Sequence, residues 1–174
     1  MKSLTEQLSN YAAYHRDARN IATHFVGIPL IILAIAALLS RPSVNVGGVM
    51  VTPALVIAGA SAVYYLRLDR PLGLLMAALF AGAVAFGHGS AAQETEVWLA
   101  IGVGGFVAGW IIQFVGHWFE GRKPAFVDDL IGLIIGPLFV VVEVLFKCGV
   151  LHGLQQEIEQ RVGPVHNGAS RRTA

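Results

Sequence analysis

Long stretches with almost no charge constrain the fold of this chain more than any other feature of its sequence. From Phe25 to Leu66 the one charged residue is Arg41, and Asp, Glu, Lys and Arg are absent from 71–93, 97–119 and 130–142. An α-helix needs about 20 mostly apolar residues to cross the roughly 30 Å hydrocarbon core of a bilayer. The predicted membrane-spanning helices are therefore about 22–40, 50–66, 71–88 and 98–117.

Composition supports the same class of protein. Of the 174 residues 55% are apolar and 13% are charged, whereas a soluble domain carries about 25% charged residues. This leaves too little polar surface for a small soluble globule, and such an apolar chain is not intrinsically disordered. The net charge of +1 offers no basic surface, so no nucleic-acid partner is expected. The single cysteine excludes an internal disulfide.

The segments that flank the spans predict the rest of the architecture. Leu4, Leu8, Tyr11 and Ala12 have helical spacing, which predicts an amphipathic helix on the membrane surface. The apolar stretch 130–146 contains Gly136-Pro137, which favours a kinked re-entrant or in-plane helical hairpin over a fifth crossing. The prediction is one all-α membrane bundle over 1–174. Its parts are an interfacial helix (1–20), four spans (21–118), a motif loop with the hairpin (119–150) and a polar tail (151–174) that frays after Gly163.

The distribution of Lys and Arg predicts the orientation. They gather in the N-terminal segment and in the loops near 67–70 and 121–124, and loops rich in these residues face the cytoplasm. The expected location is a multi-pass position in the inner membrane of a bacterium or the endoplasmic reticulum of a eukaryote.

Polar side chains at membrane depth indicate function. Gln113, His117 and Glu120 are spaced i, i+4, i+7 and share one face of a helix. A His and a Glu at i, i+3 are a known metal-ligand spacing in helical bundles. The predicted orientation puts His15 and His24 at the same membrane face, and His88 at the other. Imidazoles with a carboxylate suit non-haem Fe(II), and zinc accepts the same atoms.

Three blocks of the chain resemble the Mpo-like 2-hydroxy fatty acid dioxygenases, a family of small membrane proteins. The first block is Tyr14-His15, Asn20, His24 and Pro29. The second is Gly109-Trp110-Ile111, the run 113–117, Phe119-Glu120, Arg122, Pro124-Ala125 and Asp128. The third is Pro137, Phe139, Glu143, Leu145-Phe146-Lys147 and Gly149. The middle region, 41–107, matches in apolar character alone.

The resemblance implies an Fe²⁺-dependent α-oxidation in which a 2-hydroxy fatty acid and O₂ give a fatty acid one carbon shorter. It implies His15, His24 and His117 as metal ligands, with Glu120 as a fourth ligand or as a residue that orients the ligands. Arg122 is expected to pair with the substrate carboxylate. Gln113 and Asn20 are expected to hold imidazole tautomers or bound water, with Asn20 near the substrate. The acyl tail is expected to enter from the bilayer, and a homo-oligomer is compatible with this reading.

Other readings of these residues stay open. The chain is alternatively a zinc-dependent lipid hydrolase with the same ligands, or a non-enzymatic small transporter or structural protein. Asn20 is alternatively the N-cap of the first span, and Arg122 an anchor at anionic headgroups. Glu143 is alternatively a partner of Lys147 at i, i+4.

Overall fold

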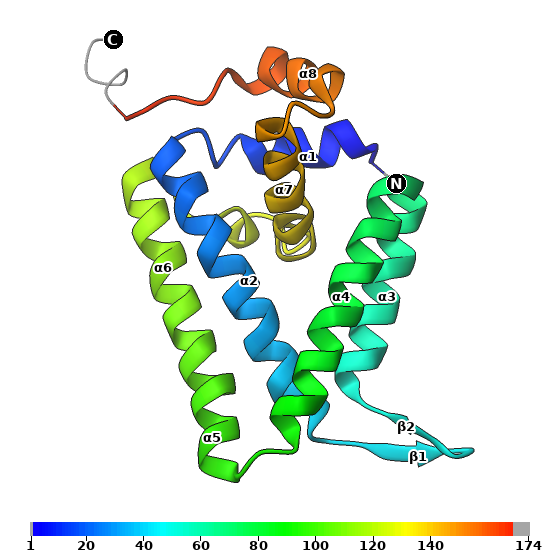
Figure 1. Cartoon of the computed structure of the whole chain (residues 1–174). Coiled ribbons are helices and arrows are strands. Elements are labelled where there is room, and N and C mark those ends of the chain that lie inside the picture. Colours follow the sequence, from blue (N-terminus) through cyan, green and yellow to red (C-terminus); the bar gives the residue numbers. More distant parts are fainter. Residues whose placement is uncertain (1, 169–174) are drawn as a thin grey trace. The chain divides into compact units, whose positions relative to one another are not determined.

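The computed structural model describes residues 2–168. The predicted fraying after Gly163 is wrong for 164–168, because His166 forms a β-bridge with Asp17, and the rest of the predicted frayed tail lies outside the described residues. The chain is all-α apart from one short hairpin (Figure 1). In chain order the elements are α1 (Leu4–Ala12), α2 (Ala18–Ser40), β1 (Val44–Val46), β2 (Val49–Val51), α3 (Pro53–Leu68), α4 (Arg70–Ala91), α5 (Thr95–Leu99), a π-helical turn (Ala100–Gly104), α6 (Gly105–Glu120), a 3₁₀ turn (Ala125–Val127), α7 (Gly132–Lys147) and α8 (His152–Val162).

Within residues 2–168, three helical stretches are long and apolar enough to cross a membrane: α2, α4 and the continuous stretch Thr95–Glu120. The pair α7 and α8 makes a fourth if the two helices, bent by 115° at their break, count as one span. α3 is apolar but has 16 residues, a length of roughly 24 Å at 1.5 Å per residue, which is short of the hydrocarbon thickness. The prediction of four full-length spans is therefore confirmed for three of them.

The predicted span 50–66 began too early, because its first residues form a β-hairpin. Val49–Val51 pairs antiparallel with Val44–Val46, and the two-residue connection Gly47-Gly48 has positive φ at both positions. Two left-handed residues between strands make the tight turn that glycine favours. Thr52 then caps α3 by accepting the backbone N–H of Leu55 at 3.2 Å, and Pro53 occupies the first turn. The glycine turn therefore makes the first residues of this apolar stretch a β-strand, and the helix begins only at Pro53.

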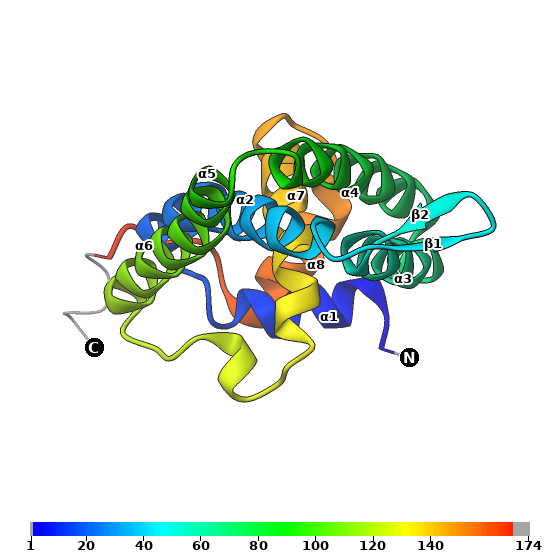
Figure 2. The ribbon, with the colours of Figure 1, turned by 90° about the horizontal axis from the view of Figure 1, so that it is seen from below.

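The predicted hairpin at 130–150 corresponds to a sharply bent helix pair, α7 and α8, but its turn is not at Pro137. Pro137 lies inside α7, and the bend comes later, where Gly149 and Leu151 have left-handed φ values of 75° and 62°. Residues 152–162, predicted as part of a polar tail, form α8. α1 lies beside α7 and α8 in Figures 1 and 2. The apolar face predicted for α1 is confirmed, since Leu8, Tyr11 and Ala12 are buried.

The chain divides into two compact units, and each is described by itself. One unit contains 29–110. There α3 and α4 pack side by side (Figure 2), and Arg41 lies 4.5 Å from the centre of the Trp98 ring. The other unit contains the described residues of 1–28 and 111–174. It comprises α1, the first turns of α2, the last turns of α6, and the chain from there to α8. All of the predicted site residues belong to this second unit.

Candidate metal centre

A short loop between α1 and α2 carries His15. α2 begins at Ala18, and Asp17 accepts the backbone N–H of Arg19 at 2.9 Å, which is the contact of an N-cap residue. The Arg19 guanidinium also hydrogen-bonds Asp17 at 2.7 Å and lowers the pKa of that carboxyl. Asn20 therefore lies in the first turn of α2, and the alternative reading of Asn20 as the N-cap is wrong.

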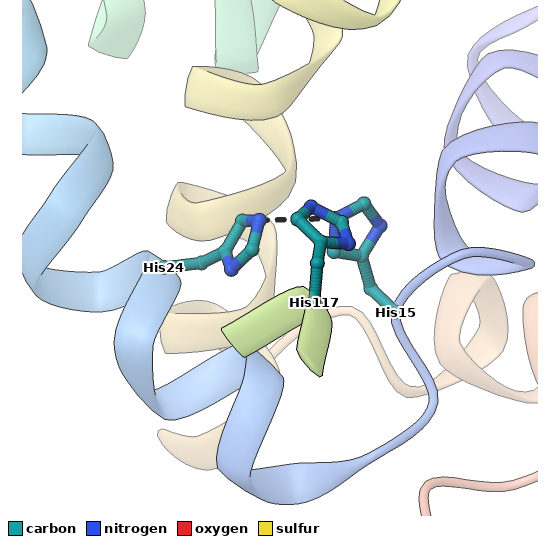
Figure 3. Close-up of side chains that lie close together, drawn as sticks. All are labelled: His15, His24 and His117. Atoms are coloured by element: carbon teal, nitrogen blue, oxygen red, sulfur yellow. Dashed lines mark hydrogen bonds between the residues drawn. The ribbon is translucent and has the colours of Figure 1, made fainter. Parts of the chain in front are cut away.

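The structure brings together the three histidines that the sequence singled out (Figure 3). His15 comes from the loop, His24 from α2 and His117 from α6, and their exposed fractions are 0%, 1% and 7%. The His15 ring centre lies 4.5 Å from that of His24 and 5.0 Å from that of His117. One nitrogen from each ring lies within 4.8 Å of the other two. Elements distant in the sequence therefore converge on one buried group of imidazoles.

Hydrogen bonds on the outer side of two rings fix their tautomers. His15 Nδ1 lies 2.7 Å from the carbonyl oxygen of Tyr11, and His24 Nδ1 lies 2.8 Å from the carbonyl oxygen of Asn20. A carbonyl oxygen only accepts, so both Nδ1 atoms carry the proton. Both Nε2 atoms then present lone pairs, and they face each other at 3.0 Å. Burial also lowers the pKa of the His15 imidazole well below its usual range, which keeps this ring neutral.

In these tautomers neither Nε2 has a proton to donate to the other, so a cation bound by both lone pairs would stabilise their close approach. A metal–imidazole bond is about 2.0–2.1 Å, so nitrogens 3.0 Å apart can bind one ion. Metal-ligating histidines typically donate their other N–H to a carbonyl or carboxylate, as His15 and His24 do here. His117 Nδ1 is buried and has no hydrogen-bond partner among the described residues. The residues present therefore fit a metal ion.

Aromatic side chains close one side of this group. The Tyr11 ring stacks on the His15 ring with centres 4.1 Å apart and planes 7° apart, and the Phe139 ring centre lies 5.6 Å from that of His15. Both aromatic residues are buried. This wall limits rotation of His15 and excludes water from that side of the histidines.

Glu120 holds the His15 loop in place. Its carboxylate accepts the backbone N–H of Arg16 at 3.1 Å and that of Asp17 at 2.8 Å. It also accepts the Asn20 amide N–H at 3.1 Å. Glu120 is not in the group that could hold an ion, which among residues 2–168 consists of the three histidines. Of the two roles predicted for Glu120, its contacts favour that of an orienting residue.

The remaining predicted site residues lie around this group. Asn20 is fully buried; its side chain contacts Glu120 and its carbonyl oxygen accepts from His24. Gln113 is buried, and its Oε1 has no hydrogen-bond partner among the described residues. Arg122 is exposed and donates from Nη1 to the carbonyl oxygen of Ala13 at 2.8 Å.

Sequence reasoning missed Arg16, which it counted as a marker of the cytoplasmic face. The residue is 6% exposed, its Nε donates to the carbonyl oxygens of Ala12 and His15, and Nη2 lies 3.8 Å from Glu143. Glu143 thus pairs with Arg16, whereas Lys147 lies over the Phe25 ring. The sequence feature that could have revealed this role of Arg16 is Glu143. A carboxylate within an apolar helix requires a cationic partner.

Gly116 provides a test of how closely α2 and α6 must approach. A Cβ at this position would overlap Thr23 Oγ1 and Asn20 Oδ1, both in the first turns of α2. We expect Gly116→Ala to displace His117 from His24 and to weaken metal binding at least tenfold, measured by competition with a chromophoric chelator. The matched control is Gly82→Ala, because Gly82 is also helical and has open space around it. Unchanged metal affinity in Gly116→Ala would contradict the required close approach.

Comparison with known proteins gives a family. The family model described as "2-hydroxy-palmitic acid dioxygenase Mpo1-like" matches residues 1–148. The chain is 30% identical over 158 residues to the 2-hydroxy-palmitic acid dioxygenase MPO1 of Saccharomyces cerevisiae, covering 90% of this chain and 87% of the yeast protein. No solved structure matches the chain significantly. The family match covers the chain from α1 to the end of α7, including all three histidines, and the chain therefore belongs to the Mpo1-like family of 2-hydroxy-palmitic acid dioxygenases.

Proposed function

We propose that this protein is an Fe²⁺-dependent dioxygenase that removes the carboxyl carbon of 2-hydroxy fatty acids. The observation that carries the proposal is the buried group of His15, His24 and His117, in which two neutral imidazoles face each other with their lone pairs. The yeast relative is named for 2-hydroxy-palmitic acid, which supports this substrate class.

The proposed reaction balances without a separate reductant. A 2-hydroxy acid RCH(OH)COOH and O₂ give RCOOH, CO₂ and H₂O. The C1–C2 bond breaks, the substrate carbons lose four electrons, and O₂ gains them. When bound by the three histidines, an iron ion supplies coordination sites for the hydroxyl and carboxylate oxygens and redox chemistry with O₂.

The surrounding residues of the chain prepare this site. The carbonyl oxygens of Tyr11 and Asn20 hold the two imidazoles in the tautomer that directs Nε2 inward. Glu120 fixes the loop of His15, and the ring of Tyr11 excludes water on one side. With three protein ligands, other coordination positions stay available to substrate.

We assign three residues to the substrate and its surroundings. Gln113 lies one turn before His117 on the same face of α6, and its unpartnered Oε1 accepts a hydrogen bond from water or from the substrate hydroxyl. Arg122 pairs with the carboxylate through N–H groups other than the one that Ala13 accepts. Asn20 keeps His24 oriented beside the substrate. The apolar helices give a lipid substrate access from the bilayer.

Metal analysis combined with oxygen uptake tests the proposal. Protein purified anaerobically in detergent should contain iron, consume one O₂ per molecule of 2-hydroxypalmitic acid and release a 15-carbon fatty acid. Palmitic acid, which has no 2-hydroxyl, is the matched control and should give no oxygen uptake. Tightly held zinc together with ester cleavage would favour the lipid hydrolase instead. Iron-loaded protein that leaves 2-hydroxypalmitic acid unchanged would overturn the proposal.

A further inference from the structure

The backbone of the His15 loop is held from two sides. On one side Glu120 accepts the N–H groups of Arg16 and Asp17. On the other side a segment near the C-terminus pairs with the loop as a parallel β-bridge between Asp17 and His166. The N–H of His166 donates to the carbonyl oxygen of Arg16 at 2.8 Å, and the N–H of Ala18 donates to the carbonyl oxygen of His166 at 2.9 Å. Buried backbone polar groups need such partners, and those supplied by His166 lie at least 148 residues along the chain from the loop residues that they pair with.

The Arg16 side chain also links the loop to the segment near the C-terminus. Its Nη1 donates to the carbonyl oxygen of Gly163 at 3.0 Å. Its Nε donates to the carbonyl oxygen of His15 itself at 3.0 Å. Gly163 has a φ of 84°, a conformation that glycine adopts readily, and with it α8 ends and the chain turns toward the loop. One buried guanidinium thus links the metal-ligand residue to the segment 163–168.

We propose that residues 163–168 are a C-terminal clamp that positions His15 for metal binding. The inference rests on the proposed metal site, and it assigns a positioning role to a segment beyond the residues 1–148 that the family model matches. The clamp pairs with the backbone on the C-terminal side of His15, while α1 and Tyr11 hold the ring. Without the clamp, the loop keeps its hydrogen bonds to Glu120 but loses those to His166 and Gly163.

The expected size of the effect follows from comparable contacts in metalloproteins. Residues that orient a metal ligand typically change metal affinity by 10–100-fold when they are altered. Metal ligands must be held within about 0.5 Å of the binding geometry. A His15 loop that is held by Glu120 alone moves more freely than one that is held by both Glu120 and the clamp. Release of the clamp should therefore lower metal affinity by at least tenfold and expose the loop amides to exchange.

A backbone substitution at His166 tests the clamp in the full-length protein. His166→Pro removes the N–H that donates to Arg16, while His166→Ala removes the side chain and keeps both backbone hydrogen bonds. We expect His166→Pro to bind Fe²⁺ at least tenfold more weakly in anaerobic competition with a chromophoric chelator. We expect His166→Ala to remain within twofold of the unaltered protein.

Amide hydrogen exchange on the metal-free protein gives a second readout that does not depend on iron or on turnover. His166→Pro should accelerate exchange at Arg16, Asp17 and Ala18, and leave the amides of α4 unchanged. Accelerated exchange throughout the chain would show general unfolding and would overturn a specific positioning role, as would unchanged iron affinity. If the unaltered protein binds no iron, the proposed function fails, while the exchange of the loop still reports whether the clamp holds it.

Discussion

His117→Ala should weaken iron binding by about 100-fold or more and abolish measurable turnover of 2-hydroxypalmitic acid. A structural metal site with four ligands binds its ion with about 10–16 kcal/mol, so one ligand contributes about 3 kcal/mol, or about 100-fold in affinity. His117 is the contribution of α6 to the three-histidine group, and the described part of the chain offers no other histidine to this group. Iron content after anaerobic desalting and oxygen uptake measure the two effects.

Two other histidines are matched controls for this substitution. His88 lies in α4, in the unit formed by 29–110, and His152 begins α8. Neither belongs to the group that could hold an ion. His88→Ala and His152→Ala should keep iron and turnover. If His117→Ala retains both, the metal centre is assigned to the wrong residues.

Glu120→Ala should lower the free energy of unfolding by about 3 kcal/mol or more and weaken metal binding with it. The substitution removes the acceptor for the N–H groups of Arg16 and Asp17 and for the side-chain amide of Asn20. Each buried donor left without a partner costs about 1–3 kcal/mol, and Glu120 is 2% exposed, so water does not readily replace the carboxylate. Chemical unfolding in a mild detergent measures the change.

The control for Glu120 is Glu94→Ala, which removes an exposed carboxylate that makes no side-chain capping hydrogen bond at the start of α5. It should change the unfolding free energy by less than about 0.5 kcal/mol, as is usual for a surface substitution. Glu120→Ala with the stability and iron affinity of the unaltered protein would show that the loop does not depend on this carboxylate. Lost iron with full stability would instead favour Glu120 as a fourth ligand.

The sequence allowed prediction of those parts of the fold that depend on local patterns. Long uncharged stretches located α2, α4 and the stretch 95–120, because apolar length alone determines whether a helix can cross a bilayer. The start of α3 and the bend after α7 were misplaced. Both boundaries depend on residues with left-handed backbone conformation, Gly47 and Gly48 before α3 and Leu151 after α7. A prediction based on apolar length does not detect such single residues within a long apolar run.

The sequence predicted which residues form the site better than it predicted the hydrogen bonds and ion pairs between them. Helical spacing put His117 and Glu120 on one face, and the resemblance of the surrounding blocks implied His15 and His24. The roles of Glu120 and Arg16 depend on contacts with residues more than 100 positions away. No local pattern specifies such partners. The sequence therefore predicted Arg16 as a cation at the cytoplasmic face, and Glu120 as either a fourth metal ligand or an orienting residue. The tautomers of His15 and His24 depend on carbonyl oxygens only four residues earlier, those of Tyr11 and Asn20, but which ring nitrogen each carbonyl meets depends on the side-chain rotamer in the folded chain.

X-ray absorption at the iron edge, on protein purified anaerobically, tests most directly whether three imidazoles share one ion. The expected spectrum shows iron bound by nitrogen and oxygen atoms, with the outer-shell scattering of three imidazole rings. In His117→Ala that scattering should fall to two rings in whatever iron is retained. A spectrum of the unaltered protein without imidazole scattering would contradict the assignment of His15, His24 and His117 as the metal centre.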